Sequence, residues 1–292
     1  MQAHPKENNV QLSACETLVK FTTKLTDKVL SAMDMSGGIG AVADAMEFHI
    51  DDVNIQKSGI NILLNLSKDQ KSMEALVTAD CAEIIAEVMR YHPEDKTVCQ
   101  ESVSLLARMA TGSTNAIHAL QSITDTVYLT INAMLASPCD KKILSNGVVV
   151  LHALSHETEA KDSIFNLGGV GAVLQAMRSN QSNENVQSQC VKVLYRIFLD
   201  DQRAQSLNSD SARAIISTTV SAMESAISLS SLQADAATLL WTLCSRDKTL
   251  VKLALDCGAL YVLLRAAKVH IDSASVQERF LDALHYLAVD EV

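Results

Sequence analysis

The sequence predicts an all-α fold, a right-handed α-solenoid of about six three-helix repeats preceded by one isolated third helix. The first observation is a helical segment that returns after 45, 43, 45, 43, 46 and 44 residues. The second is a leucine that stands seven positions into every copy of this segment. A fixed period in the forties, filled with helix-forming residues, is typical of solenoids in which each repeat packs only on its neighbours.

We call the first residue of each copy its anchor, and we count later positions as offsets from it. The anchors are Gln11, Gln56, Cys99, Leu144, Gln187, Gln233 and Gln277. The leucines at offset 7 are Leu18, Leu63, Leu106, Leu151, Leu194, Leu240 and Leu284. We therefore predict third helices over residues 10–23, 54–67, 97–110, 142–155, 185–199, 231–244 and 275–288.

A second landmark stands ten residues before each anchor from the second anchor on, as Met46, Met89, Met134, Met177, Met223 and Ala267. This constant interval predicts a turn of fixed length between the second and third helices. Pro93 and Pro138 lie four residues after their methionines, where proline would end the second helix. Earlier breaks at Gly37-Gly38, Gly168-Gly169 and Cys257-Gly258 predict the end of a short first helix, because glycine allows the chain to turn there.

These boundaries divide the chain into a polar N-terminal tail and a single solenoid. The tail covers residues 1–9 and the solenoid residues 10–292. The predicted units are about 10–24, 25–67, 68–110, 111–155, 156–199, 200–244 and 245–292.

The third helix has a wide apolar arc at offsets 3, 4, 6, 7, 10 and 11, which includes Phe21 and Leu281. So wide an arc predicts a helix wedged between others, with a narrow polar strip at offsets 2, 5 and 9. Stacked repeats would turn this strip into a ladder along the concave surface. Offset 5 holds Glu16, Asn61, Ser104, Val149, Lys192, Thr238 and Asp282, and offset 9 holds Lys20, Asn65, Arg108, Ala153, Arg196, Thr242 and Tyr286.

Composition excludes several classes of partner. The net charge of −10 argues against nucleic acid and anionic lipid, which need a basic surface. No apolar run approaches 20 residues, so we expect no membrane insertion. The seven cysteines are scattered without a CxxC pair, which indicates a reducing compartment, the cytoplasm or also the nucleus. Cys190 occupies a slot that small residues fill in other repeats, so we predict that it is buried.

The sequence offers no catalytic or cofactor motif. It contains no P-loop, dinucleotide fingerprint, nucleophile elbow or HExxH pattern, so we expect no enzyme and no cofactor. His152 and His156 are spaced like two zinc ligands, but without a placed third ligand they do not predict a metal site. Histidines recur three residues after a landmark, and we expect them to cap helix-end carbonyls. These histidines are His49, His92 and His270.

The three-helix unit of about 44 residues, with its glycine break, resembles the armadillo repeat. The best copy has Ile55-Gln56, Gly59, Leu63, Asn65, Leu66 and Ser67 in the pattern VQ…A…L.NL. Val186-Gln187 and Leu232-Gln233 open two further copies, and the resemblance covers about residues 10–292. It implies that the third helices line a groove that binds extended peptides.

Two subgroups of armadillo proteins suggest different ligands. Importin-α proteins carry tryptophan at offset 5 and asparagine at offset 9, whereas here only Asn65 matches and the sole tryptophan, Trp241, stands at offset 8. β-Catenin-like domains bind acidic peptides with basic groove residues, which Lys20, Arg108 and Arg196 at offset 9 resemble. Lys and Arg make up 24 of 292 residues, so seven such positions would hold zero or one by chance, and three are found.

The resemblance therefore implies a non-enzymatic scaffold or adaptor that binds an extended, acidic protein segment along the concave groove. Two alternatives stay open. One is a regulatory armadillo domain acting in cis within a larger signalling protein, because the sequence begins and ends with a third helix. The other is a nuclear import cargo adaptor. The expected groove residues are Lys20, Asn61, Asn65, Ser104, Arg108, Lys192, Arg196, Trp241, Thr242 and Tyr286.

The recurrent leucine generates a stability prediction. We expect Leu106, Leu151 and Leu194 to be fully buried, and each change to alanine to cost about 2–5 kcal/mol because it leaves a cavity. Chemical denaturation of Leu151→Ala, in the middle of the array, measures this cost. A loss below about 1 kcal/mol would contradict the assignment of this leucine to the core.

Overall fold

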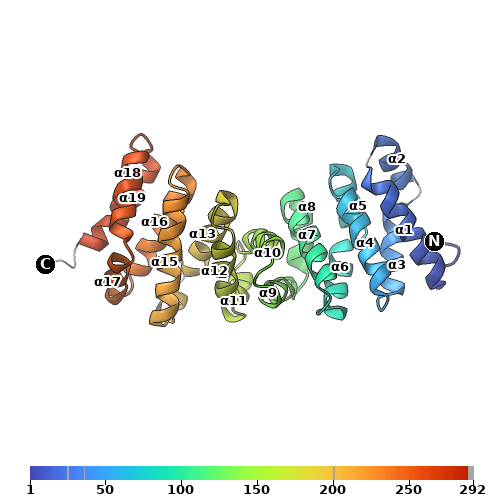
Figure 1. The fold of residues 1–292 in the computed structure, drawn as a ribbon, viewed down its shortest axis with the longest axis horizontal. Coiled ribbons are helices and arrows are strands. Elements are labelled where there is room, and N and C mark those ends of the chain that lie inside the picture. The colour runs from blue at the N-terminus through green and yellow to red at the C-terminus, as the bar shows by residue number, and fades with distance from the viewer. Residues whose placement is uncertain (25, 36, 200, 289–292) are drawn as a thin grey trace. The chain divides into compact units, whose positions relative to one another are not determined.

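The computed structural model describes residues 1–288 apart from residues 25, 36 and 200. These residues form nineteen α-helices and no strand, which confirms the all-α class (Figure 1). None of the described helices combines the length and apolar character that crossing a lipid bilayer requires. The chain divides into two compact blocks, Met1–Leu154 and Ser155–Val292. We call them the N-terminal and C-terminal blocks and describe each by itself.

The third helices differ from their predicted bounds by at most two residues at either end. They are α1 (Asn8–Thr23), α4 (Val53–Leu66), α7 (Lys96–Gly112), α10 (Lys141–Leu154), α13 (Glu184–Phe198), α16 (Ser230–Cys244) and α19 (Ala274–Ala288). In the N-terminal block α1 packs on α4, α4 on α7 and α7 on α10. In the C-terminal block α13 packs on α16 and α16 on α19. The predicted side-by-side stacking of third helices is thus confirmed within each block.

Each third helix after α1 follows a first and a second helix. The first helices are α2 (Asp27–Met35), α5 (Gln70–Thr78), α8 (Thr114–Ser122), α11 (Thr158–Asn166), α14 (Asp201–Gln205) and α17 (Lys248–Asp256). The second helices are α3 (Gly38–Phe48), α6 (Cys81–Tyr91), α9 (Thr126–Ala136), α12 (Gly169–Ser179), α15 (Ser209–Ser225) and α18 (Ala259–Val269).

Left-handed residues mark four of the breaks between first and second helices. Gly37, Gly168 and Gly258 have φ values of 62°, 80° and 83°, which confirms the predicted glycine breaks. Asp80 occupies the same place before α6 with a φ of 49°. The sequence did not reveal this break, because a short polar side chain can adopt the left-handed conformation without glycine.

A glutamine side chain explains the constant ten-residue interval. The amide of Gln56 donates both of its N–H groups across the turn, to the carbonyl of Met46 at 2.9 Å and to that of His49 at 2.7 Å. Gln187, Gln233 and Gln277 make the same pair of bonds ten and seven residues back. A change in turn length would move the amide away from both carbonyls, of which that of His49 also accepts from the backbone N–H of Asp52. The interval is also ten residues before Cys99 and Leu144, where the anchor is not a glutamine.

The first residues of the chain take the place of such a turn. Gln11 donates to the carbonyls of Met1 and His4, again ten and seven residues back. Residues 1–9 were expected to be a polar tail before the solenoid. Residues 8 and 9 begin α1, and the bonds from Gln11 hold Met1 and His4 as the other glutamine anchors hold the turns before them.

The recurrent histidines do meet carbonyl groups, but the carbonyls belong to the preceding repeat. Nε2 of His49 lies 2.8 Å from the carbonyl oxygen of Pro5. His92 and His270 make equivalent contacts of 2.7 Å with Ile50 and Ile227. A carbonyl only accepts, so Nε2 carries the proton. The histidines therefore join successive repeats within a block.

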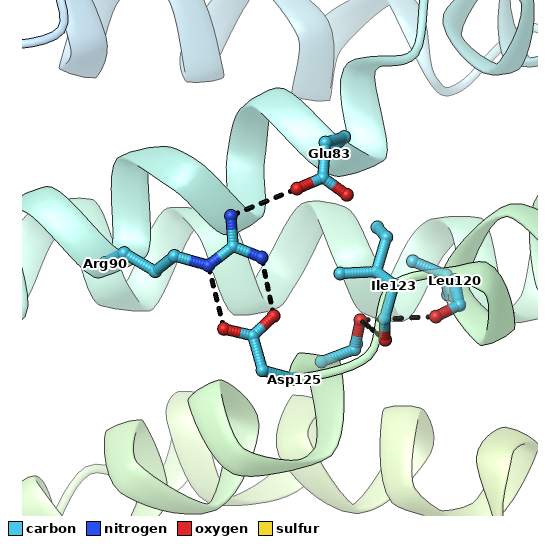
Figure 2. Close-up of polar contacts among 6 residues, drawn as sticks. Glu83, Arg90, Leu120, Ile123 and Asp125 are labelled. Carbon is cyan, nitrogen blue, oxygen red and sulfur yellow. Dashed lines mark hydrogen bonds and ion pairs between the residues drawn. The ribbon is translucent and has the colours of Figure 1, made fainter.

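An arginine joins the second helices α6 and α9 (Figure 2). Arg90 in α6 donates to both carboxylate oxygens of Asp125, from Nε at 2.8 Å and from Nη2 at 2.6 Å. Its Nη1 donates to Glu83 at 3.0 Å. The hydrogen bonds from Arg90 lower the pKa of Asp125. A bidentate pair of this kind holds the second helices of two repeats at one spacing.

The exposed fractions of the side chains confirm that the predicted core residues of the inner repeats are buried. Leu106, Leu151 and Leu194 are at most 1% exposed, and Cys190 is fully buried. Two arc residues depart from the prediction, because Phe21 is 59% exposed and Leu281 is 67% exposed. Among the described residues, α1 and α19 have a third helix on one side only within their blocks, so part of their apolar arc stays uncovered.

The glutamine contact predicts a large effect of Gln56→Ala. The carbonyl of Met46 would lose its partner while buried, which costs about 1–3 kcal/mol, and that of His49 would keep only the bond from the backbone N–H of Asp52. We expect urea denaturation to show a total loss of about 2 kcal/mol or more. Gln70→Ala, on the exposed start of α5, is the matched control and should change stability by less than about 0.5 kcal/mol. Equal effects of the two changes would refute the role of the anchor.

Candidate functional site: the polar strip of the third helices

The strip consists of the side chains at offsets 2, 5 and 9 on neighbouring third helices. The anchor glutamines of α4, α13 and α16 fix how these helices are rotated, because each glutamine must reach the turn behind it. The side chains at the other offsets then point in fixed directions, so the strip residues of adjacent helices lie opposite one another.

A side chain at offset 2 reaches offset 5 of the preceding third helix. Nδ2 of Asn146 in α10 donates to Oγ of Ser104 in α7 at 2.8 Å. Nη1 of Arg279 in α19 donates to Oγ1 of Thr238 in α16 at 3.5 Å. This contact between offset 2 and offset 5 occurs in both blocks. We therefore use it to infer which residue an offset-2 side chain faces where no hydrogen bond joins the two.

The arginines at offset 9 are held by serines of the preceding repeat. Nε of Arg108 donates to Oγ of Ser67 at 2.7 Å, and Nη2 donates to the carbonyl of Ser67 at 3.2 Å. Nη1 of Arg196 donates to Oγ of Ser155 at 3.0 Å. The oxygens of Ser67 and Ser155 are neutral, so these contacts position the guanidinium groups without neutralising their charge.

The C-terminal block gathers three cations around one carboxylate. Asp235 stands at offset 2 of α16, which places it opposite Lys192 at offset 5 of α13. Burial raises the pKa of Asp235, and the positive charges of Lys192, Arg196 and Arg279 act in the opposite direction. Burial also lowers the pKa of His156, and Arg196 adds to that shift. We call Lys192, Arg196, Asp235 and Arg279 the cation cluster.

The sequence interpretation missed two members of this cluster, Asp235 and Arg279. Both stand at offset 2, which was recognised as part of the strip, but charges were compared only at offsets 5 and 9. Comparing all three offsets across neighbouring helices would have placed both residues beside Lys192 and Arg196.

The asparagines and the lysine expected in the N-terminal block lie at the surface or partly buried. Lys20 is exposed on α1. Asn61 and Asn65 are half-buried and bonded to each other, with Nδ2 of Asn65 3.0 Å from Oδ1 of Asn61. Nζ of Lys68 donates to Oδ1 of Asn65 at 3.1 Å. Ser104 is only 6% exposed and its hydroxyl is bonded to Asn146, so little of its side chain is available to a ligand.

Two of the expected groove residues in the C-terminal block, Trp241 and Tyr286, contact each other, whereas a third, Thr242, is buried. The rings of Trp241 and Tyr286 meet edge to face with centroids 6.3 Å apart. Thr242 was predicted to line the groove, yet it is fully buried. Its side chain is short, and α16 is flanked by α13 and α19, so Thr242 cannot reach a partner.

Among the described residues, no three or more His, Cys, Asp or Glu side chains are grouped so that they could hold a metal ion. The buried thiols of Cys15 and Cys81 have pKa values raised by burial to about 11 and about 12, so they stay protonated and unreactive. The chemistry that the strip offers is hydrogen bonding and charge.

Comparison with known proteins gives one family and several solved structures. A family model described as LRRK2 ARM repeat matches residues 1–288. An engineered protein has a TM-score of 0.58 at 21% identity, over 86% of this chain and 96% of that one. A second engineered protein has a TM-score of 0.53 at 20% identity, over 85% and 98%. A designed armadillo repeat protein in complex with the peptide (KR)4 has a TM-score of 0.50 at 12% identity, over 97% and 98%. No curated protein matches.

The cation cluster predicts a further shift in the pKa of Asp235 when a cation is removed. Lys192 stabilises the carboxylate, so Lys192→Gln should raise the pKa of Asp235 further above its ordinary value. A carbon-13 NMR titration of the carboxyl group measures this change. Because the folded pKa is raised, the stability that Asp235 contributes is present at low pH and lost as pH rises through that pKa.

The control is Lys252→Gln on the exposed side of α17, which should leave the titration of Asp235 unchanged. If Lys192→Gln also left it unchanged, Lys192 would not face Asp235 and the offset rule would fail.

Proposed function

The chain belongs to the LRRK2 ARM repeat family, and we propose that it is a non-enzymatic scaffold that binds an extended, acidic segment of a partner protein along the polar strip. The armadillo-repeat fold is typically a protein-binding scaffold, and no enzymatic family is indicated. The designed armadillo protein of similar fold holds a peptide. The proposed location is the cytoplasm, with the nucleus as the alternative.

The observation that carries this proposal is the way Arg108 is held. Its guanidinium is oriented by two oxygens of Ser67, and neither is a carboxylate. The side chain is therefore ordered before a ligand arrives and keeps a full positive charge. A partner carboxylate would gain a charge-assisted hydrogen bond without the entropy cost of ordering a free arginine.

The C-terminal block supports the same choice of ligand. Its three cations exceed the single carboxylate of Asp235, so the cluster carries a surplus of positive charge. The Trp241–Tyr286 pair, at offsets 8 and 9 of neighbouring helices, offers an apolar contact beside it. The rest of the chain is acidic, with a net charge of −10 overall. An acidic segment would be attracted to the strip and repelled elsewhere, which favours one binding position.

The charge of the strip disfavours a basic ligand. The designed armadillo protein is bound to (KR)4, a basic peptide. A lysine- or arginine-rich segment on this chain would meet Arg108, or Lys192, Arg196 and Arg279, at like charge. The nuclear import alternative requires basic cargo, so the acidic segment is the better match.

The test is binding of a fluorescein-labelled octaglutamate peptide, measured by anisotropy at low and physiological salt. Arg108→Gln combined with Arg196→Gln should weaken binding by roughly tenfold or more, because each glutamine removes a charge that the peptide would meet. The salt dependence of the remaining binding should also fall.

The matched control is Ser67→Ala combined with Ser155→Ala, which removes the tethers and keeps both charges. We expect this control to weaken binding much less than the arginine changes. Asp235→Asn, which removes the negative charge of the cluster, should strengthen binding. Binding that is indifferent to all of these changes would refute the strip as the site.

A further inference from the structure

Three pockets recur at one position of the repeat, between second-helix segments that follow each other. The pocket between residues 1–5 and α3 has a volume of about 210 Å³. The pocket between α6 and α9 has about 550 Å³, and the pocket between α12 and α15 about 410 Å³. Each contains the landmark methionine and the anchor of one repeat, and the residues 5, 2 and 1 before the next landmark. The shared register shows that the backbone of the repeat creates this hollow.

The side chains that line the equivalent hollows differ in chemistry. In the α12–α15 pocket, helix α15 contributes hydroxyl groups from Ser217, Thr218, Ser221 and Ser225. In the α6–α9 pocket, the equivalent positions of α9 are Tyr128, Leu129, Asn132 and Ala136. The fold therefore accepts polar side chains at these positions, and the apolar lining of the α6–α9 pocket is not required for packing.

The apolar lining is also partly open to solvent. Tyr128 is 46% exposed and Leu135 is 50% exposed, and both line the pocket together with Pro93. The residue equivalent to Leu135 in α15 is Glu224, which is exposed. Leaving apolar side chains in water around a hollow is unfavourable, and such patches mark interaction sites.

One wall of the pocket is already rigid before any ligand binds. Arg90 lines the pocket, and its guanidinium is held by Asp125 and Glu83, as Figure 2 shows. Two carboxylates satisfy its charge, so this arginine does not need an acidic ligand. An apolar side chain can enter without separating an ion pair or ordering the wall.

A second hollow shares Ala136 with this pocket, and its charged lining residues are Lys96, Asp140, Lys141 and Lys142. Nζ of Lys96 lies 3.2 Å from Asp140. Lys141 and Lys142 are exposed, and their ammonium groups form no ion pair with the described residues. The surface beside the apolar pocket is therefore locally basic, and it complements a segment in which acidic residues follow an apolar one.

We propose that the pocket between α6 and α9 is a second protein-binding site, which takes a leucine or phenylalanine side chain of a partner segment whose neighbouring residues are acidic. The site lies on second helices and their turns, so it does not depend on the strip of the third helices. The apolar side chain fills the hollow between Tyr128, Leu135 and Pro93, and a carboxylate of the same segment meets Lys141 or Lys142.

The equivalent pocket supplies the substitutions for the test. Tyr128→Ser and Leu135→Glu together install the residues that α15 carries at the same positions, so the fold should tolerate them. The probe is a fluorescein-labelled glutamate-rich peptide with two leucines four residues apart. We expect this double variant to bind the probe roughly tenfold more weakly than the natural chain, with an unchanged thermal melt by circular dichroism.

Four comparisons decide the proposal. A probe with alanine in place of both leucines should bind the natural chain as weakly as the leucine probe binds the double variant. Lys141→Glu with Lys142→Glu should also weaken binding of the leucine probe, whereas Arg108→Gln with Arg196→Gln should leave its leucine-dependent part intact. Ser217→Tyr with Glu224→Leu in α15 should add leucine-dependent binding.

Three results would overturn the proposal. The first is equal binding of the leucine and alanine probes by the natural chain. The second is self-association that Tyr128→Ser with Leu135→Glu abolishes, measured by sedimentation, because the occupant would then be a second copy of the chain. Loss of leucine-dependent binding in the Arg108→Gln, Arg196→Gln variant would assign the probe to the strip and also refute the second site.

Discussion

The double hydrogen bond of the anchor glutamine is the interaction on which the rest of the structure depends. One amide group satisfies two carbonyls at the end of the second helix, and it does so from the start of the third helix. The bond fixes the turn length and the rotation of the third helix together. Both the core arc and the polar strip are set by that rotation. Cys99 keeps a weaker form of one of these bonds through Sγ, 3.7 Å from the carbonyl oxygen of His92 seven residues back.

Ties between repeats follow the same period as the core. The histidine contacts, the offset-2 contacts and the arginine–serine contacts each join a repeat to the one before it at a fixed register. Ion pairs also join neighbouring repeats, because Arg90 pairs with Asp125, Arg203 with Asp162 and Lys57 with Asp95. Arg108 differs, since the two oxygens of Ser67 that hold it are neutral. Arg108 can therefore serve both as a tie and as a candidate ligand contact.

The structure distinguishes two surfaces of the repeat that serve different chemistry. The strip on the third helices presents cations that are already oriented. The hollow between second helices recurs because the backbone of the repeat creates it, and its lining residues differ from one pair of repeats to the next. A scaffold of this kind can diversify its contacts without altering its backbone, because exposed lining residues such as Tyr128 and Leu135 can change while the buried landmark and anchor residues stay the same. Function in such a fold lies in particular side chains and not in the architecture.

The sequence by itself determined the helices and the core. Period, leucine and turn length all follow from local spacing, so the third helices and the burial of Leu106 and Leu194 were predicted within narrow bounds. Three breaks between first and second helices were not predicted, those before α6, α9 and α15. The break at Asp80 depends on a backbone conformation that several residue types can adopt.

Only the tertiary structure decided which polar residues face one another and which are covered. Thr242 stands at the same offset as Arg108, yet flanking helices bury it. Asp235 and Arg279 joined the candidate site because neighbouring helices stack with offset 2 against offset 5. The α6–α9 pocket was not foreseen either, since its walls come from two repeats. The spacing of residues along the chain determines which side chains lie on each face of one helix, whereas contacts between helices depend on how the repeats pack.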